Sequence, residues 1–494
     1  MSSMSDSGAT GEGGGLKLAT ARTLKWNAID RVASQLLYAG VGIVLANVLS
    51  KEDFGLVGAL VVFQAFAILF VDSGFGAALL QKKNPDDRDY STVFWFNLAV
   101  SVAVYLLLWL AAPAIAAIFQ GDERLIPLSK VMFLTFVING LSIVQTNRLM
   151  KRMDVKQIAI ANTVALVTSG VLGVCLALGG FGPWALVWQS VANAAVKTAW
   201  LWVTGHWRPA GFSIDSLKGM WRLGLSVFSS SMLNTLFLNV YSFVIGAFYS
   251  LSSLGVYSQA DKWSKMGSAS LSQVLTSSFV PLLARVQDSP ADFHRYMRKA
   301  NRFTAFVTLP AMAGLAVGAA PLFHLLFGHK WDAAIPLFQI LAVRGIFVVM
   351  ISLAGNYLLA LGRGKLLMVV EAVKDGFIAL AILATVFALD MTLLVCGQLF
   401  ASVATVAVVG VITARATGYS LWRSMSDMAP FALVTAAMTA GCMLLLELPL
   451  SPLVSLLVVA SAGALFYAGI LAITKTPELR EAASYLFGRF RPRK

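Results

Sequence analysis

Apolar segments long enough to cross a bilayer occupy almost the whole sequence and are joined by short connectors. A hydrocarbon core about 30 Å thick is crossed by roughly 20 apolar residues in a helix. Lipid offers no hydrogen bonds to exposed backbone groups, so segments of this length are expected to be helical. The chain of 494 residues is 58% hydrophobic and only 13% charged, with a mean hydropathy of +0.76. We therefore predict an all-α polytopic membrane protein with about fourteen transmembrane helices.

Positive charge in the connectors falls almost entirely on one side of the predicted membrane. The helices are placed at 24–48, 53–80, 91–119, 125–147, 156–178, 183–204, 221–248, 255–284, 302–327, 333–360, 365–389, 392–414, 428–446 and 452–474. If the chain starts inside, the opposite loops hold only Lys51, Arg124 and Lys330. This is the positive-inside pattern, so the net charge of +14 reflects orientation and not nucleic-acid binding. We predict that both termini are cytoplasmic.

The sequence repeats itself at a distance of about 200 residues, which predicts two halves. Ser50–Gly55 aligns with Ser250–Gly255, and Asn147 aligns further on with Asn356. Each half has six predicted helices, an even number, so both insert the same way up around a pseudo-two-fold axis along the membrane normal. The expected parts are a disordered cytoplasmic tail at 1–23, an N-lobe at 24–204, a cytoplasmic linker at 205–220, a C-lobe at 221–414, two extra C-terminal helices at 428–474 and a basic cytoplasmic tail at 475–494.

Several short motifs resemble one family, the polysaccharide transporter (Wzx-type lipid-linked oligosaccharide flippase) family of the multidrug/oligosaccharidyl-lipid/polysaccharide exporter superfamily. The similarity covers most of 24–414, and its motifs lie at Ser50–Val57, Asp72–Gln81, Gly255–Ala260, Leu326–Trp331 and Ile335–Leu341. The resemblance implies two six-helix lobes with two extra helices, in a bacterial cytoplasmic (inner) membrane. It implies a transporter and not an enzyme.

The resemblance also implies a cargo and partners. The cargo is an undecaprenyl-diphosphate-linked oligosaccharide, flipped from the cytoplasmic to the outer leaflet by alternating access for surface polysaccharide, exopolysaccharide or lipopolysaccharide biosynthesis. Besides membrane lipid, the implied partners are a polysaccharide polymerase and export machinery. The family supplies no universal site residues, so candidates must come from this sequence.

The first predicted helix carries a polar stripe on an otherwise apolar surface. At helical spacing, one face holds Asn27, Asp30, Arg31, Ser34 and Tyr38. A polar face of this kind does not sit against lipid, so we expect it to line a water-filled cavity between the halves. The alternative is helix–helix hydrogen bonding through small polar residues.

The eighth predicted helix carries a second polar face, which includes Asp261, Lys262 and Lys265. Arg344 lies deep in the tenth helix, and Asn234 of the seventh aligns with Ser34 in the repeat. Cationic side chains suit a diphosphate, and arginine can contact it in a bidentate way. The predicted cavity site for the diphosphate and sugars therefore consists of Arg31, Lys262, Lys265, Arg344, Asn27, Ser34, Tyr38 and Asn234.

Three acidic residues within the spans are candidates for ion coupling, namely Asp30, Asp72 and Asp261. Burial raises a carboxyl pKa, so such a group can carry a coupling H⁺ or Na⁺; we predict no other cofactor. For Asp72 the alternative role is to hold a helix break before Gly74. Glu371 and Lys374 are three apart, which favours a structural ion pair, with Asp375 beside it.

The sequence predicts no metal site. The three cysteines lie in apolar spans and form no CxxC pair. His324 and His329 flank one outer loop, but we find no third ligand at metal spacing.

Two other function classes remain as alternatives. A cation-coupled multidrug exporter on the same fold would favour an aromatic, acidic cavity, whereas the charges here are mainly basic. A membrane glycosyltransferase, glycan polymerase or ligase would need an outward domain that carries carboxylates or histidines. The outer loops are short and hold only scattered acids such as Glu52 and Asp122.

Overall fold

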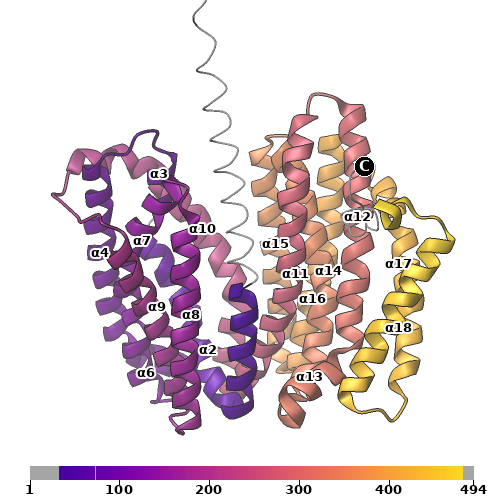
Figure 1. Cartoon of the computed structure of the whole chain (residues 1–494), viewed down its shortest axis with the longest axis horizontal. Helices are drawn as coiled ribbons and strands as arrows, with labels where there is room; N and C mark the ends of the chain where they lie inside the picture. Colours follow the sequence, from indigo (N-terminus) through magenta and orange to yellow (C-terminus); the bar gives the residue numbers. More distant parts are fainter. Residues whose placement is uncertain (1–32, 73, 482–494) are drawn as a thin grey trace, which may run out of the picture. The chain divides into compact units, whose positions relative to one another are not determined.

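A computed structural model describes residues 33–72 and 74–481, which form α-helices and two short 3-10 turns with no strand among them (Figure 1). By its contacts the chain divides into two compact units, Met1–Gly255 and Val256–Lys494. The all-α prediction is confirmed for the described residues. Asn27, Asp30 and Arg31 lie outside them, as do the tail predicted at 1–23 and most of the tail predicted at 475–494.

The N-terminal unit contains ten helical segments among its described residues. They are Ala33–Val48, α2 (Lys51–Asp72), α3 (Phe75–Gln81), α4 (Asp87–Leu110), α5 (Ala112–Ile118), α6 (Leu125–Met132), α7 (Leu134–Lys151), α8 (Val155–Leu178), α9 (Pro183–Thr204) and α10 (Ile214–Phe248). Helix α8 packs along α9, and α7 packs against both α4 and α9. At one end, a buried cluster joins Phe75 and Leu79 of α3 to Phe94 of α4 and to Trp207.

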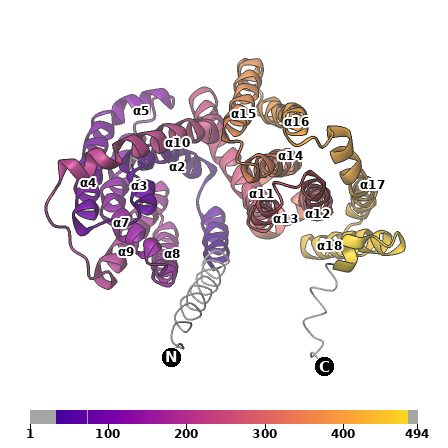
Figure 2. The same cartoon turned by 90° about the horizontal axis from the view of Figure 1, so that it is seen from above.

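The C-terminal unit is built from the remaining helices. They are α11 (Leu251–Arg285), whose first turn belongs to the N-terminal unit, α12 (Pro290–Val317), α13 (Ala319–Phe327), η1 (Gly328–Trp331), α14 (Ala334–Ala360), α15 (Gly364–Thr385), η2 (Val386–Ala388), α16 (Met391–Thr417), α17 (Leu421–Leu446) and α18 (Pro452–Ile473). Phe279 of α11, Met297 of α12 and Leu353 of α14 share one buried cluster. Helices α17 and α18 form a hairpin beside α12 (Figures 1 and 2).

Each of the predicted spans coincides with helix in the described residues, but fewer meet a strict criterion for crossing a membrane. Between residues 33 and 481, residue 73 apart, nine helices are long and apolar enough, or ten if α12 and α13, bent by 61°, count as one span. Helices α11 and α15 fall short because polar and charged side chains interrupt their apolar sequence. The count of fourteen crossings therefore stays a prediction.

Several helices begin before their predicted starts, and α10 and α12 show the reason most clearly. Helix α10 begins at Ile214, inside the predicted linker, because the Ser213 side chain accepts a hydrogen bond from the backbone N–H of Ser216 and caps the helix. Helix α12 begins at Pro290, well before the predicted start at 302, and Ser289 caps it in the same way. Polar first turns thus extend these helices beyond their apolar spans.

The starts of α2 and α11, which the repeat aligns, have matching local chemistry. Ser50 accepts a hydrogen bond from the N–H of Asp53 at 3.0 Å, and Ser250 accepts one from the N–H of Ser253 at 3.0 Å. Both are helix N-caps of the kind that serine provides. The two aligned positions therefore start a helix in the same way.

Two glycines bring these helix starts into reciprocal contact. A Cβ added to Gly55 would lie 1.8 Å from the Leu251 carbonyl oxygen, and one added to Gly255 would lie 1.9 Å from the Lys51 carbonyl oxygen. Only glycine permits such a close backbone approach. These two contacts agree with the 200-residue offset of the repeat at this point of the chain. A two-fold relation between the whole lobes stays a prediction.

Candidate functional site

The polar face of α11 holds one acidic and two basic side chains within two turns. The Lys265 Nζ atom lies 2.6 Å from Asp261 Oδ2, an i,i+4 ion pair. Asp261 is buried, while the Lys265 side chain is 48% exposed. Lys262 places its Nζ atom 5.4 Å from the centroid of the Trp263 ring. The face therefore holds two ammonium groups and one carboxylate, of which Lys265 and Asp261 form an ion pair.

Asp261 has one carboxylate oxygen that finds no hydrogen-bond partner among the described residues. Its Oδ1 atom is buried, whereas Oδ2 is held by Lys265. A buried charged oxygen without a donor is costly, so positions of this kind are characteristic of functional sites. The free oxygen could accept a proton or a small cation. The ion pair with Lys265 was not predicted from the sequence, although the i,i+4 spacing of Asp261 and Lys265 is typical of one.

Arg344 lies on α14, which packs on α11 near Ser268. Its Nε atom donates a hydrogen bond to Ser402 Oγ of α16 at 3.2 Å. The next residue, Gly345, faces α11 so closely that an added Cβ would lie 3.2 Å from the Cβ of Ser268. Ser268 is one turn from Lys265, so α14 crosses α11 beside its charged face. Arg344 itself is oriented by α16.

The candidate residues of the N-terminal unit have varied exposure. The structure describes Ser34, Tyr38, Asp72 and Asn234 there. Tyr38 is 50% exposed, Asn234 is exposed, and Ser34 is partly buried. Their predicted role in binding stays a prediction.

Asp72 lies at the break between α2 and α3. Its carboxylate accepts a hydrogen bond from the backbone N–H of Gly76. A Cβ on Gly76 would meet Asp72 Oδ1 at 2.5 Å and the side-chain nitrogen of Asn147 at 2.6 Å, so glycine is needed there. This geometry fits the helix-break role, while ion coupling by Asp72 stays untested.

The structural ion pair predicted on α15 is present. Lys374 contacts Glu371 on the same face of the helix, and its Nζ atom lies 3.7 Å from Asp375 Oδ1. Asp375 is buried. The Lys374 ammonium group is therefore close to the carboxylates of both Glu371 and Asp375.

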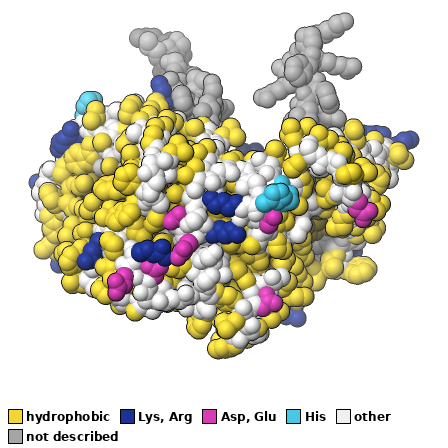
Figure 3. All heavy atoms as spheres, turned by 90° about the horizontal axis from the view of Figure 1, so that it is seen from below, with side chains coloured by type: hydrophobic (Ala, Val, Ile, Leu, Met, Phe, Trp, Pro, Cys, Tyr) yellow, Lys and Arg dark blue, Asp and Glu magenta, His cyan; other side chains and the backbone are white. Residues whose placement is uncertain are grey.

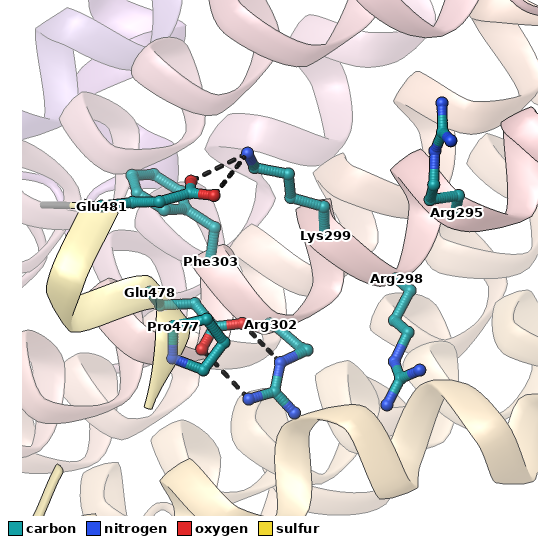
Figure 4. Close-up of a pocket in the computed structure, with 8 residues that line it drawn as sticks. All are labelled: Arg295, Arg298, Lys299, Arg302, Phe303, Pro477, Glu478 and Glu481. Atoms are coloured by element: carbon teal, nitrogen blue, oxygen red, sulfur yellow. Dashed lines mark hydrogen bonds and ion pairs between the residues drawn. The ribbon is translucent and has the colours of Figure 1, made fainter. Parts of the chain in front are cut away.

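A further feature that was not predicted from the sequence is a basic cluster on α12 (Figure 4). It surrounds a cavity of about 380 Å³ between α12 and the segment that follows α18. Lys299 and Arg302 point to the carboxylates of Glu481 and Glu478, as the dashed lines in Figure 4 mark. The Arg302 pair is bidentate, at 2.5 and 3.0 Å. Burial raises the pKa of Glu478, but hydrogen bonds from Arg302 outweigh it and hold that pKa below its ordinary value.

The other two cations of this cluster have carboxylate partners of their own. Arg298 lies 3.2 Å from Asp427 of α17, and Arg295 lies 3.0 Å from Asp292. Asp427 also accepts a hydrogen bond from Tyr419, and burial together with this bond raises the pKa of Tyr419 to about 12. Each cation of the cluster is thus neutralised within the unit.

An apolar groove runs beside this cluster, along α12, α17 and α18. It has a volume of about 540 Å³ and includes Phe306, Gly314, Met438 and Tyr467 in its lining. Phe303, one turn before Phe306, lines the basic cavity. The groove and the cavity are therefore neighbours on α12.

The fold is similar to the folds of two solved membrane transporters. It is similar to the structure titled lipid II flippase MurJ, inward closed conformation, with a TM-score of 0.75, 13% identity, and coverage of 90% of this chain and 98% of the other. An inward-facing multidrug resistance MATE family transporter of the MOP superfamily gives a TM-score of 0.57 at 16% identity, covering 80% and 95%. At these identities the likeness concerns the fold alone.

The sequence defines the family more closely. The family model described as polysaccharide biosynthesis protein matches residues 44–336, more than half of the chain, so this multi-pass membrane protein belongs to that family. It is 27% identical over 348 residues to the teichuronic acid biosynthesis protein TuaB of Bacillus subtilis (strain 168), covering 69% of this chain and 71% of the relative. It is 26% identical over 348 residues to the lipopolysaccharide biosynthesis protein WzxC of Escherichia coli (strain K12), covering 69% of each. The family resemblance drawn from the motifs is confirmed.

Proposed function

We propose that this protein is a flippase that moves undecaprenyl-diphosphate-linked oligosaccharide units from the cytoplasmic to the outer leaflet of a bacterial inner membrane. The family and the MurJ-like fold support a flippase of lipid-linked saccharides in general. The observation that carries the proposal is the charged face of α11, where Lys262 lies beside the ion pair of Asp261 and Lys265. A charge within a membrane fold is costly, and it is characteristic of a substrate or ion pathway.

In this proposal the lipid head binds to α11. Lys262 and Lys265 contact the diphosphate, and Arg344 reaches it from α14. Charge-assisted hydrogen bonds of ammonium and guanidinium groups to phosphate are about twice as strong as neutral ones. Arg31 and the polar residues Asn27, Ser34 and Tyr38 of the first predicted helix complete the predicted set, together with Asn234 of the seventh. Alternating access of the two lobes then carries the head across.

The lipid tail and the coupling ion have their own proposed places. The apolar groove of α12, α17 and α18 suits a prenyl chain, which stays in contact with lipid. Asp261 is the first candidate to carry a coupling H⁺ or Na⁺, since one of its buried oxygens has no hydrogen-bond partner among the described residues. Asp30 and Asp72 are the other candidates.

The test is genetic complementation with a chemical readout. The gene is deleted, and undecaprenyl-diphosphate-linked saccharides in the membrane are quantified by mass spectrometry. We expect a complete, unpolymerised unit to accumulate, and wild-type protein to clear it. A Lys262→Gln, Lys265→Gln variant should leave it uncleared.

A matched control removes a cation elsewhere in the spans. Lys130→Gln is suitable, because its Nζ atom lies 4.3 Å from the centroid of the Trp109 ring and away from α11 in sequence and unit. It should clear the intermediate as wild type does. If no lipid-linked intermediate accumulates in the deletion strain, the cargo is something else, and the multidrug exporter alternative takes its place.

A further inference from the structure

Two histidines and an aspartate meet at the loop between α13 and α14. His324 Nε2 lies 3.0 Å from Asp332 Oδ1, and His329 Nδ1 lies 3.2 Å from Asp332 Oδ2. The two imidazole rings have centroids 4.4 Å apart. One potential ligand atom from each of the three residues lies within 4.8 Å of the others. On the face seen in Figure 3, histidine side chains in cyan lie against an acidic one in magenta.

This arrangement corrects the sequence argument, which found no third ligand near the histidines. Asp332 is three residues after His329, and the 3-10 turn η1 brings its carboxylate back to both rings. His324 is placed at the end of α13. The spacing His-x4-His-x2-Asp thus becomes a single cluster only through the turn between the two helices.

Buried neighbours hold the turn that carries the three side chains. Trp331 is 1% exposed and Phe327 is 4% exposed, so both ends of η1 are anchored in the interior. Gly328 between them has φ of +61°, a backbone conformation that glycine adopts readily. The His329 side chain is 82% exposed, that of Asp332 51% and that of His324 27%. The cluster is therefore preorganised by the core and open to an ion.

We propose that His324, His329 and Asp332 form a binding site for a divalent transition metal of the Zn²⁺ class. Imidazole nitrogen and carboxylate oxygen are ligands that Zn²⁺ takes at about 2.0–2.2 Å, usually with four ligands in a tetrahedron. Tetrahedral ligands at that distance are roughly 3.3 Å apart, close to the 3.0 and 3.2 Å observed here. The metal would take the place of the two hydrogen bonds between these atoms, with each neutral imidazole carrying its proton on the other ring nitrogen, and water would supply the fourth ligand.

The inference is independent of transport, and binding tests it directly. Full-length protein, purified in detergent with an affinity tag that lacks histidine and freed of metal with a chelator, is titrated with Zn²⁺ by calorimetry. We expect one equivalent to bind, and Co²⁺ to give the visible absorption band of a four-coordinate complex. His329→Ala should weaken Zn²⁺ binding at least tenfold, and Asp332→Asn should do the same.

The control removes an imidazole outside the cluster. His206 is exposed and lies in the other unit, so His206→Ala should leave the affinity unchanged. His329 is exposed too, so its loss should leave the fold intact, which the melting temperature of the metal-free protein checks. The proposal is overturned if no stoichiometric Zn²⁺ binding occurs, or if Asp332→Asn and His329→Ala bind Zn²⁺ as tightly as wild type.

Discussion

Helices α11 and α12 of the C-terminal unit both carry clusters of basic side chains, but the clusters differ in their place on the helix. On α11, inside the span predicted at 255–284, Lys265 pairs with Asp261, and Lys262 places its ammonium group near the Trp263 ring. On α12 every cation has a carboxylate of its own: Arg295 with Asp292, Arg298 with Asp427, Lys299 with Glu481, and Arg302 with Glu478. The α12 cluster is larger, yet it is neutral as a whole.

The difference teaches how to separate a binding site from a structural joint. A neutral set of ion pairs between α12, α17 and the segment after α18 fastens these elements together and leaves no charge for a ligand. The charges on α11 lie inside a predicted span, and one buried oxygen of Asp261 has no hydrogen-bond partner among the described residues, which is a cost in a membrane fold and is characteristic of a substrate or ion pathway. The place of the charges, and not the number of cations, therefore points to α11 as the binding surface.

The largest expected effect is on transport by variants of α11. In proteoliposomes, Lys262→Gln together with Lys265→Gln should slow the flipping of a lipid-linked oligosaccharide at least tenfold, because both contacts to the diphosphate are lost. Arg298→Gln with Lys299→Gln, the matched pair on α12, should keep the rate within about twofold. Equal losses for the two double variants would break the comparison.

Asp261 sharpens the comparison on the α11 side. Asp261→Asn keeps the side-chain shape but removes the negative charge and the titratable group. If the acid couples an ion, we expect the imposed H⁺ or Na⁺ gradient to lose its effect on flipping, while Lys262 and Lys265 still bind the head. A variant that responds to both gradients as wild type does would exclude Asp261 from coupling.

The ion pairs that connect α12 to α17 and to the segment after α18 should contribute to the stability of the protein. Arg302→Ala leaves the carboxylate of Glu478 buried without its partner, and breaking a buried pair from one side costs about 3–5 kcal/mol. Because the Arg302 side chain is 20% exposed, we expect the lower end of this range. Arg302→Met combined with Glu478→Leu should recover most of it. Unfolding in detergent measures both, and an unstable double variant would argue against this reading.

Acid should weaken the ion pair between Arg302 and Glu478. Burial raises the pKa of Glu478, but the Arg302 hydrogen bonds bring it below the 4.5 of a free glutamate. A carboxyl with a depressed pKa contributes stability above its unfolded pKa, and this contribution is lost as the pH falls through the folded value. The distance between spin labels on α12 and after α18 should stay constant down to about pH 4.5, and then lengthen. In the Arg302→Met, Glu478→Leu variant the pH should have no such effect.

The smallest effect is expected at the exposed ion pair of the α12 cluster. Lys299 and Glu481 have side chains 48% and 52% exposed, with 2.8 Å between Nζ and Oε2. Exposed ion pairs contribute about 0.2–1 kcal/mol, so Lys299→Ala should lower the unfolding free energy by less than Arg302→Ala. The loss should also shrink at high salt, because screening weakens exposed pairs.

Local patterns allowed much of the fold to be predicted from the sequence. The helices were predicted from the apolar spans. The repeat aligned Ser50 with Ser250, and both are helix N-caps in the structure. Glu371 and Lys374 were predicted as a pair because they are three apart on one helix. Asp261 and Lys265 carry the same kind of signal at four apart, and their ion pair could have been predicted in the same way.

Contacts between distant segments were beyond the sequence argument. Arg302 and Glu478 are brought together by the packing of α17 and α18 on α12, which no local pattern encodes. Asp332 joins the two histidines only because the chain turns through η1. The neutrality of the α12 cluster, which decides its role, is thus a property of tertiary structure.

The most direct test of the account is the affinity of the lipid head for the α11 face. Binding of undecaprenyl-diphosphate-linked saccharide to purified protein can be measured by native mass spectrometry, for wild type, the Lys262→Gln, Lys265→Gln variant and the Arg298→Gln, Lys299→Gln variant. The account predicts at least a tenfold weaker affinity for the α11 variant, about 1.4 kcal/mol or more, and wild-type affinity for the α12 variant. Unchanged affinity for the α11 variant, or a loss only in the α12 variant, would contradict it.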